Sequence, residues 1–492
     1  MMKYVSELLS GNHSRFPERN HEDKGGISMK MRRVFSFLLA LALAAVLPFG
    51  ALAEAPGGTP PGDPPSGGMG PGGAGGGFGG GTPPGGSTSS FEYTAATEIT
   101  SAAEQADAVY ASDTANESAL IIDTDGEVTI SNPTVTKTGD SDGGDNCNFY
   151  GLNAALLVMG GAEATITGGE ITSDASGANG VFCYGGNGAS NGAGGDGTTV
   201  YISDTVITTT GSGSGGIMTT GGGITYASNL TVTTSGQSSA PIRTDRGGGT
   251  VVVDGGSYTS NGLGSPVIYS TANITVRSAT LLSNLSEGVC IEGMNAITLE
   301  NCDLTANNTS MNGNATFLDS IMIYQSMSGD ADSGTSTFTM SGGSLTSLSG
   351  HMFHVTNTHA VIALSNVALN NLGSDILLSV CDDGWSGASN TAELIAGSQE
   401  LTGVILVGSN STLSLTLSNG SSFEGTFSGE ITNAKGAAVS TEIGTVHVSL
   451  DETSSWTLTA DTYITSFDGS AENVIGNGYT LYVNGTALTG TN

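Results

Sequence analysis

Basic residues are scarce in this 492-residue chain, which has 12 lysines and arginines against 45 acidic residues. Seven of the basic residues and four of the acidic residues precede position 54. The rest of the chain therefore has five basic residues against 41 acids, a net charge near −36. Such a surface repels nucleic acid and anionic lipid and attracts cations, so we exclude nucleic-acid binding.

The chain is also poor in cysteine, tryptophan and helical periodicity. Its five cysteines show no CxxC motif, and an odd number without regular spacing gives no disulfide framework. We expect them to be small buried hydrophobic residues. The apolar run at 34–47 is too short for a bilayer, which needs about 20 residues. We expect no membrane span in the mature chain, and a monomer.

The first 89 residues indicate export. Residues 29–53 combine a basic start, an apolar core and an Ala-Leu-Ala cleavage site, which is typical of a secretory signal peptide. Residues 1–28 would be an upstream extension from a mis-assigned start. Residues 54–89, rich in Gly and Pro, predict a disordered linker. We therefore expect a secreted, extracellular protein that associates with a bacterial cell surface.

A short phrase repeats over residues 119–410: apolar, any, apolar, any, turn-former, two more, apolar. Examples are "ATITGGEI" (164–171), "VVVDGGSY" (251–258) and "ITLENCDL" (297–304). Most intervals between phrases are 23–26 residues, with longer ones of 36 and 41. Period-2 strands and Gly/Asn/Asp turns at this spacing predict a solenoid of stacked coils. The fifth position of the phrase should form a tight corner at Asn132, Gly168, Asp204, Asn229, Gly255, Ser278, Asn301, Gly342 and Asn366.

A second strand follows each phrase. Its predicted interior column is Val181, Ile217, Ile242, Val267, Val289 and Phe353. The longer intervals predict excursions near 138–152, 185–198 and 306–334, which is where solenoids usually bind ligands. Residues 90–118 should form an N-terminal cap with a short helix at 100–110, and residues 411–492 the last coils and a C-terminal cap.

The stretches "GSPVIYSTANITV" (264–276) and "GNGYTLYVNGTAL" (476–488) resemble the right-handed parallel β-helix of the pectate-lyase-like superfamily. Over roughly 120–490 the chain is most similar to the secreted, adhesin-like, non-enzymatic members. The resemblance implies an all-β, right-handed parallel β-helix with terminal caps. It does not fix an activity, because this fold hosts lyases, hydrolases and binding proteins.

The stretch "PIRTDRGGGT" (241–250) carries the strongest candidate site. With Ile242 facing inward, Arg243 and Asp245 should face outward, and Glu292 should lie two coils further on, about 10 Å away. We predict a ligand-binding patch of Arg243, Asp245, Arg246 and Glu292. Three interpretations stay open: a structural Arg–Asp–Arg pairing of Arg243, Asp245 and Arg246 at a Gly-rich turn, ligand contact, or catalysis by Asp245, Glu292 and Arg243. The structural one is favoured, because the Arg-x-Pro-x-x-Arg stretch of pectate lyases is missing.

One further group is a candidate metal site, and a pair of histidines is considered and rejected as a second. Asp140, Asp142 and Asp145 lie in a Gly-rich loop, and hard cations take oxygen ligands from such loops, so calcium is the predicted ion. His351 and His354 are three apart on a predicted strand, which places them on opposite faces, so they should not share a metal ion.

The favoured function is therefore a secreted, non-catalytic, adhesin-like protein that binds a polysaccharide or cell-surface glycan through lateral loops. The alternatives are a polysaccharide lyase or glycoside hydrolase acting on the outer face, and a structural envelope component.

Overall fold

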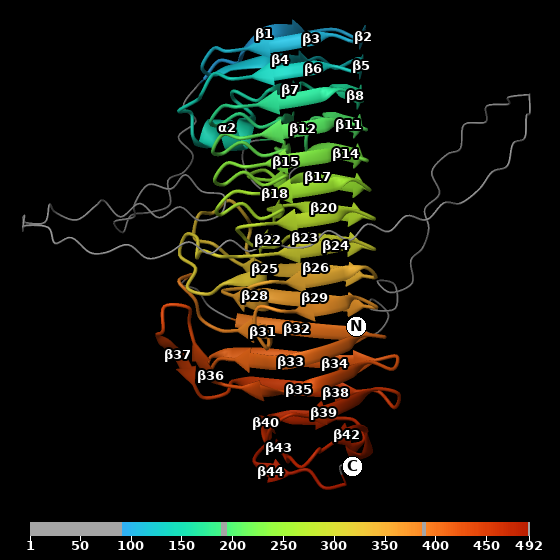
Figure 1. The fold of residues 1–492 in the computed structure, drawn as a ribbon, viewed down its shortest axis with the longest axis vertical. Coiled ribbons are helices and arrows are strands. Elements are labelled where there is room, and N and C mark those ends of the chain that lie inside the picture. The colour runs from blue at the N-terminus through green and yellow to red at the C-terminus, as the bar shows by residue number, and fades with distance from the viewer. Residues whose placement is uncertain (1–90, 188–193, 386–389, 491–492) are drawn as a thin grey trace, which may run out of the picture. The chain divides into compact units, whose positions relative to one another are not determined.

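The computed structural model describes residues 91–187, 194–385 and 390–490. The predicted upstream extension, signal peptide and linker lie outside these residues. The described chain forms a right-handed parallel β-helix in which each coil contributes a strand to two or three long parallel sheets (Figure 1).

Sheet A has 15 strands, sheet B has 14 and sheet C has 10. Sheet A contains β1 (Thr94–Ile99), β4 (Glu117–Asp123), β7 (Leu156–Met159), β10 (Val181–Tyr184), β13 (Ile217–Thr220), β16 (Ile242–Thr244), β19 (Ile268–Ser270), β22 (Val289–Glu292), β25 (Asp319–Tyr324), β28 (His351–Thr356), β31 (Ile376–Val380), β33 (Glu400–Val407), β35 (Ser422–Ser428), β39 (Ser455–Leu458) and β42 (Val474–Ile475).

Sheet B contains β2 (Ala103–Ala106), β5 (Glu127–Ser131), β8 (Glu163–Thr167), β11 (Thr199–Ser203), β14 (Gly223–Ser228), β17 (Gly249–Asp254), β20 (Asn273–Arg277), β23 (Ala296–Glu300), β26 (Thr335–Ser341), β29 (His359–Ser365), β32 (Asn390–Gly397), β34 (Ser411–Ser418), β38 (Thr445–Leu450) and β41 (Ser466–Asp468).

Sheet C contains β3 (Val109–Ser112), β6 (Thr134–Lys137), β9 (Glu170–Ser173), β12 (Val206–Thr209), β15 (Thr231–Thr234), β18 (Ser257–Ser260), β21 (Thr280–Ser283), β24 (Asp303–Ala306), β27 (Ser344–Ser347) and β30 (Ala368–Asn371). The other elements are α2 (Asp145–Tyr150), a hairpin of β36 (Glu430–Thr432) and β37 (Ala438–Thr441), a small sheet of β40 (Thr462–Ile464), β43 (Leu481–Val483) and β44 (Thr486–Ala487), and the 3-10 helix η1 (Ala471–Asn473).

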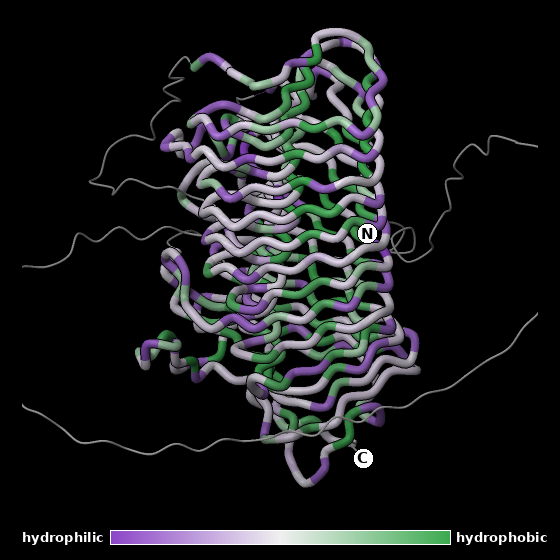
Figure 2. Tube along the Cα trace, turned by 45° about the horizontal axis from the view of Figure 1, so that its top comes forward, coloured by the Kyte–Doolittle hydropathy of each residue, from purple (hydrophilic) through white to green (hydrophobic). Residues whose placement is uncertain are grey.

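The repeated phrase forms the strand–corner–strand unit of sheets B and C. Ile166, Ile202, Val253, Val276 and Leu299 belong to one in-register column and are buried, as the alternation predicts. Figure 2 shows apolar residues recurring on successive coils. All nine predicted corner residues have a positive φ, between 51° and 72°. Asn, Asp and Gly suit this left-handed conformation, which explains why they mark the repeat.

Three details of the predicted fold are wrong. In the interior column of sheet A, Ile268 and not Val267 pairs with Ile242. Residues 100–110 form β2 and β3 instead of a helix, since their backbones pair with β5 and β6. The predicted excursion at 306–334 contains strand β25. It therefore consists of two excursions, one before and one after this sheet A strand in the chain.

The excursions at 138–152, 307–318 and 325–334 form a second layer on the outer face of sheet A. Three apolar clusters outside the interior core lie there, built around Phe182, Tyr324 and Phe317. Their partners include residues of the turns and of the β36–β37 hairpin, such as Ala154, Trp385 and Ile431. Sheet A is consequently buried on both faces over much of its length. The five cysteines are free and buried, as predicted.

Candidate functional site

The Gly triplet after Arg246 forms a turn that only glycine fits. Gly247 and Gly248 have φ of 87° and 66°. A Cβ on Gly247 would lie 2.3 Å from the carbonyl oxygen of Asn187. The charged stretch is therefore the end of strand β16 followed by a turn whose backbone lies against the turns that follow β13 and β10.

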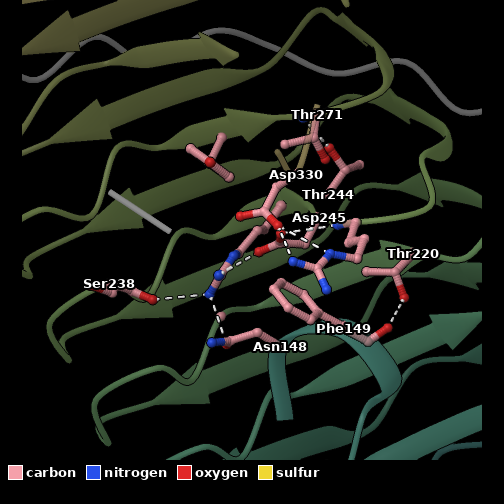
Figure 3. A network of polar contacts seen from close by, with 12 residues as sticks. Asn148, Phe149, Thr220, Ser238, Thr244, Asp245, Thr271 and Asp330 are labelled. Carbon is pink, nitrogen blue, oxygen red and sulfur yellow. Dashed lines mark hydrogen bonds and ion pairs between the residues drawn. The ribbon is translucent and has the colours of Figure 1, made fainter. Parts of the chain in front are cut away.

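Arg243 and Asp245 follow the predicted alternation but are not on the surface. Ile242 is in the interior core and Arg243 is outside it, facing α2. Arg243 is only 2% exposed and Asp245 is 0% exposed. The prediction of an accessible outer patch is wrong at these residues, because α2 and the segment 325–334 cover this part of sheet A (Figure 3).

Arg243 forms a buried ion pair with Asp245. Its Nη2 donates to Asp245 Oδ2 at 2.7 Å, and its Nη1 donates to Asn148 Oδ1 and to the carbonyl oxygen of Ser238, both at 3.2 Å. The guanidinium carbon lies 5.8 Å from the ring centroid of Tyr269. Arg243 thus connects sheet A to α2 and to the preceding turn.

Arg246 pairs with Asp330 and not, as the structural interpretation implied, with the side chain of Asp245. Its Nε and Nη2 donate to Asp330 Oδ1 at 3.1 and 2.5 Å. Its guanidinium carbon lies 4.2 Å from the ring centroid of Phe149 in α2. Arg246 therefore joins two excursions that are far apart in sequence.

Glu292 lies in the position two coils beyond Asp245, as predicted, and accepts four hydroxyl donors. The Tyr269 and Tyr324 hydroxyls donate to Oε2 at 2.5 and 3.1 Å. The hydroxyls of Ser326 and Ser328 donate to Oε1, the latter at 3.1 Å. Because Glu292 is 2% exposed, these donors replace solvent around the carboxylate and hold the segment 325–334 on the sheet.

Both carboxyl groups are shifted toward the protonated form. Burial raises the pKa of Asp245 to about 7, although Arg243 opposes the shift. Burial also raises the pKa of Glu292, and the Ser326 and Tyr269 hydroxyls counteract this in part. Such carboxyls have the chemistry of general acids, but here their oxygen atoms are buried and contact donors of the protein itself.

A second buried cluster was not predicted. His351 and His354 both contact the Ser379 hydroxyl, through Nδ1 at 2.8 and 2.7 Å. His354 Nε2 lies 3.3 Å from Asp383 Oδ2. The prediction of opposite faces for the two histidines is wrong, because Met352 and Phe353 both enter the interior core and break the alternation.

Ser379, His354 and Asp383 thus combine a hydroxyl, an imidazole and a carboxylate, but all are buried. Thr316 and the Gly384 amide hold Asp383 Oδ1 through donors at 2.6–2.7 Å. Burial lowers the pKa of His351 to about 3, so this imidazole is neutral. The cluster is suited to fixing the excursion at 307–318 on sheet A.

The three aspartates of the predicted calcium loop are separated by local structure. Asp140 Oδ1 accepts from the Ser176 amide at 2.8 Å, and Asp145 begins α2. Across residues 91–187, 194–385 and 390–490, no three His, Cys, Asp or Glu side chains are grouped to hold a metal ion. Calcium binding by this loop stays a prediction.

No protein-family model matches the chain, and no similar protein was found among curated proteins or solved structures. In the described part of the chain, no helix has the length and apolarity to cross a membrane. Fold and site together define a right-handed parallel β-helix protein whose outer sheet A face is covered by its own excursions.

Proposed function

We propose that this protein is an exported, non-catalytic, adhesin-like member of the pectate-lyase-like β-helix proteins, and that it binds a glycan on a cell surface. The burial of Asp245 and Glu292 is the observation that carries the proposal. A polysaccharide hydrolase needs acids that reach the glycosidic oxygen, and a lyase needs a base that reaches a carbon-bound proton. Both carboxyls instead contact donors of the protein.

The signal-like segment at 29–53 and the Gly/Pro-rich segment at 54–89 support export and presentation on a tether. The high negative charge supports a ligand that is not a polyanion. The decisive experiment is a combined glycan-binding and turnover assay on residues 54–492. Binding without release of reducing ends or unsaturated uronides is the expected result, and sustained turnover would refute the proposal.

A polysaccharide lyase or hydrolase is the second candidate, because perturbed carboxyl pKa values gather at catalytic sites. Here the raised pKa values of Asp245 and Glu292 favour it. In that case Asp245→Asn would abolish turnover, although the variant would still show the melting transition of a folded protein. If the protein neither binds nor cleaves any glycan, a structural role in the envelope takes precedence.

A further inference from the structure

Four aromatic rings gather at the first coils of sheet A, outside the interior core. They come from three segments: Phe91 and Tyr93 precede β1, Tyr150 ends α2 and Tyr184 ends β10. Ring centroids are 5.0 Å apart for Phe91–Tyr93, 5.6 Å for Phe91–Tyr150 and 5.7 Å for Tyr150–Tyr184. All four side chains are partly exposed. We call these four residues the tyrosine cluster.

Ring geometry separates this cluster from the exposed pair Tyr201 and Tyr226. Tyr201 and Tyr226 stack in parallel on sheet B, with ring planes 12° apart, so each ring covers one face of the other. In the tyrosine cluster, the Tyr150 and Tyr184 planes meet at 82°. In an edge-to-face contact the partner does not cover the faces of the ring that contributes its edge, and both tyrosines keep part of their surface exposed to a ligand.

Polar groups surround the rings. The Tyr93 hydroxyl donates to the carbonyl oxygen of Tyr150 at 2.8 Å and fixes the junction of β1 with α2. Within the described residues, the Tyr150 and Tyr184 hydroxyls have no hydrogen-bond partner. The exposed carboxylates of Asp123 and Asp196 lie close enough to act electrostatically on Tyr93 and Tyr184, respectively.

We propose that the tyrosine cluster, with Asp123 and Asp196, is a binding site for a neutral, hydroxyl-rich glycan. The inference rests on the proposed function and gives it a place on the molecule and a ligand class. Aromatic faces pack against the apolar C–H faces of sugar rings, and the free hydroxyls and carboxylates exchange hydrogen bonds with sugar hydroxyls. Two carboxylates at the rim, within a strongly acidic protein, exclude polyuronates and sulfated glycans by charge repulsion.

The test is native affinity electrophoresis of residues 54–492 in gels that contain xyloglucan, galactomannan or mixed-linkage β-glucan, with polygalacturonate as the anionic polymer. We expect retardation by at least one neutral polymer and none by polygalacturonate. Tyr150→Ala and Tyr184→Ala should each weaken binding about tenfold, as loss of a buried aromatic anchor does. Tyr150→Phe, which keeps the ring, should retain most of the affinity.

Tyr226→Ala is the matched control, because Tyr226 is a partly exposed tyrosine on a different sheet. Melting temperatures identify any variant that is merely unfolded, and two separate alanine variants guard against that loss. Retarded wild type with unchanged Tyr150→Ala and Tyr184→Ala would place the site elsewhere while the proposed function stands. Wild type that no neutral polymer retards would overturn both, and retardation by polygalacturonate alone would overturn the ligand class.

Discussion

The outer faces of sheets A and C differ sharply although the same coils build them. The central outward column of sheet A is buried over ten successive strands: Ile121, Leu157, Phe182, Met218, Arg243, Tyr269, Cys290, Met322, His354 and Ser379. The equivalent column of sheet C is partly exposed: Thr136, Thr172, Thr208, Thr233, Thr259, Leu282, Thr305 and Thr346.

The difference arises in the turns and not in the strands. Turns between sheets B and C are single tight corners with positive φ, which cannot cover a neighbouring face. Turns that enter and leave sheet A carry α2, the segment 325–334 and the β36–β37 hairpin. A solenoid can thus keep a regular interior while one outer face acquires a second core, with polar groups that must be satisfied internally.

Among the changes that test the covered face of sheet A, removing Arg243 should lower the free energy of unfolding most. Arg243→Ala leaves the Asp245 carboxylate buried without its ion-pair partner, and we expect the free energy of unfolding to fall by about 3–5 kcal/mol. Arg277→Ala is the control. It breaks an ion pair with Glu300 in which both side chains are 41% exposed, and should cost less than about 1 kcal/mol. Urea denaturation measures both, and equal losses would contradict a covered sheet A.

A change of pH should have the second-largest effect on the free energy of unfolding. The folded-state pKa of Asp245 is raised to about 7, so this carboxyl binds a proton that the unfolded chain releases near pH 4. Its contribution is fully present below the unfolded pKa and is lost as pH rises through 7. We expect the free energy of unfolding to fall on the order of 1 kcal/mol per pH unit approaching pH 7.

His351 acts in the opposite sense at lower pH. Its folded pKa is lowered to about 3, so its contribution is lost as pH falls below about 6.5. The two contributions oppose each other between about pH 4 and pH 6.5, so stability should be nearly constant there and lower at pH 8 than at pH 6. Urea denaturation between pH 5 and pH 8 tests this, and Asp245→Asn should flatten the decline between pH 6 and pH 8. Greater stability at pH 8 than at pH 6 would count against the burial of these acids.

The strand alternation was predictable from sequence, but the cover over Arg243 was not. Interior and corner residues follow from local period and turn chemistry. The burial of Arg243 depends on Asn148 and that of Glu292 on Ser326, which lie 95 and 34 residues away in the chain. No local sequence pattern predicts that two excursions so far apart in the chain pack on the same sheet.

Two of the wrong predictions, at Val267 and at the two histidines, have different causes. Val267 is buried in the interior core, but its assignment to the in-register column was avoidable, because Ile217, Ile242 and Ile268 each follow the end of the preceding sheet C strand by eight residues. The contact of His351 and His354 with one serine had no such signal. It depends on Met352 and Phe353 both entering the core, which tertiary packing decides.

Glu292→Gln should have a moderate effect. The amide keeps the shape of the side chain but weakens the charge-assisted bonds from Tyr269, Tyr324 and the two serines, so we expect a loss of about 1–2 kcal/mol. The segment 325–334 should also become sensitive to limited proteolysis. Glu300→Gln on the open side should change neither stability nor cleavage, and an uncut 325–334 segment in Glu292→Gln would argue against its fixation by Glu292.

The smallest effect should come from a corner between sheets B and C. Ser278 has a φ of 52°, where a side chain costs energy that glycine avoids, so Ser278→Gly should stabilise the protein by about 0.5 kcal/mol after the entropy cost of glycine. Ser203→Gly, at the end of strand β11 in sheet B, should destabilise it by about 0.5–1 kcal/mol, because the strand gains nothing from glycine. Urea denaturation measures the change in the free energy of unfolding for both variants. Opposite signs of this change would show that the backbone conformation of the corner determines which residue is favoured there. A loss at both positions would mean that the Ser278 side chain has contacts worth more than its backbone strain.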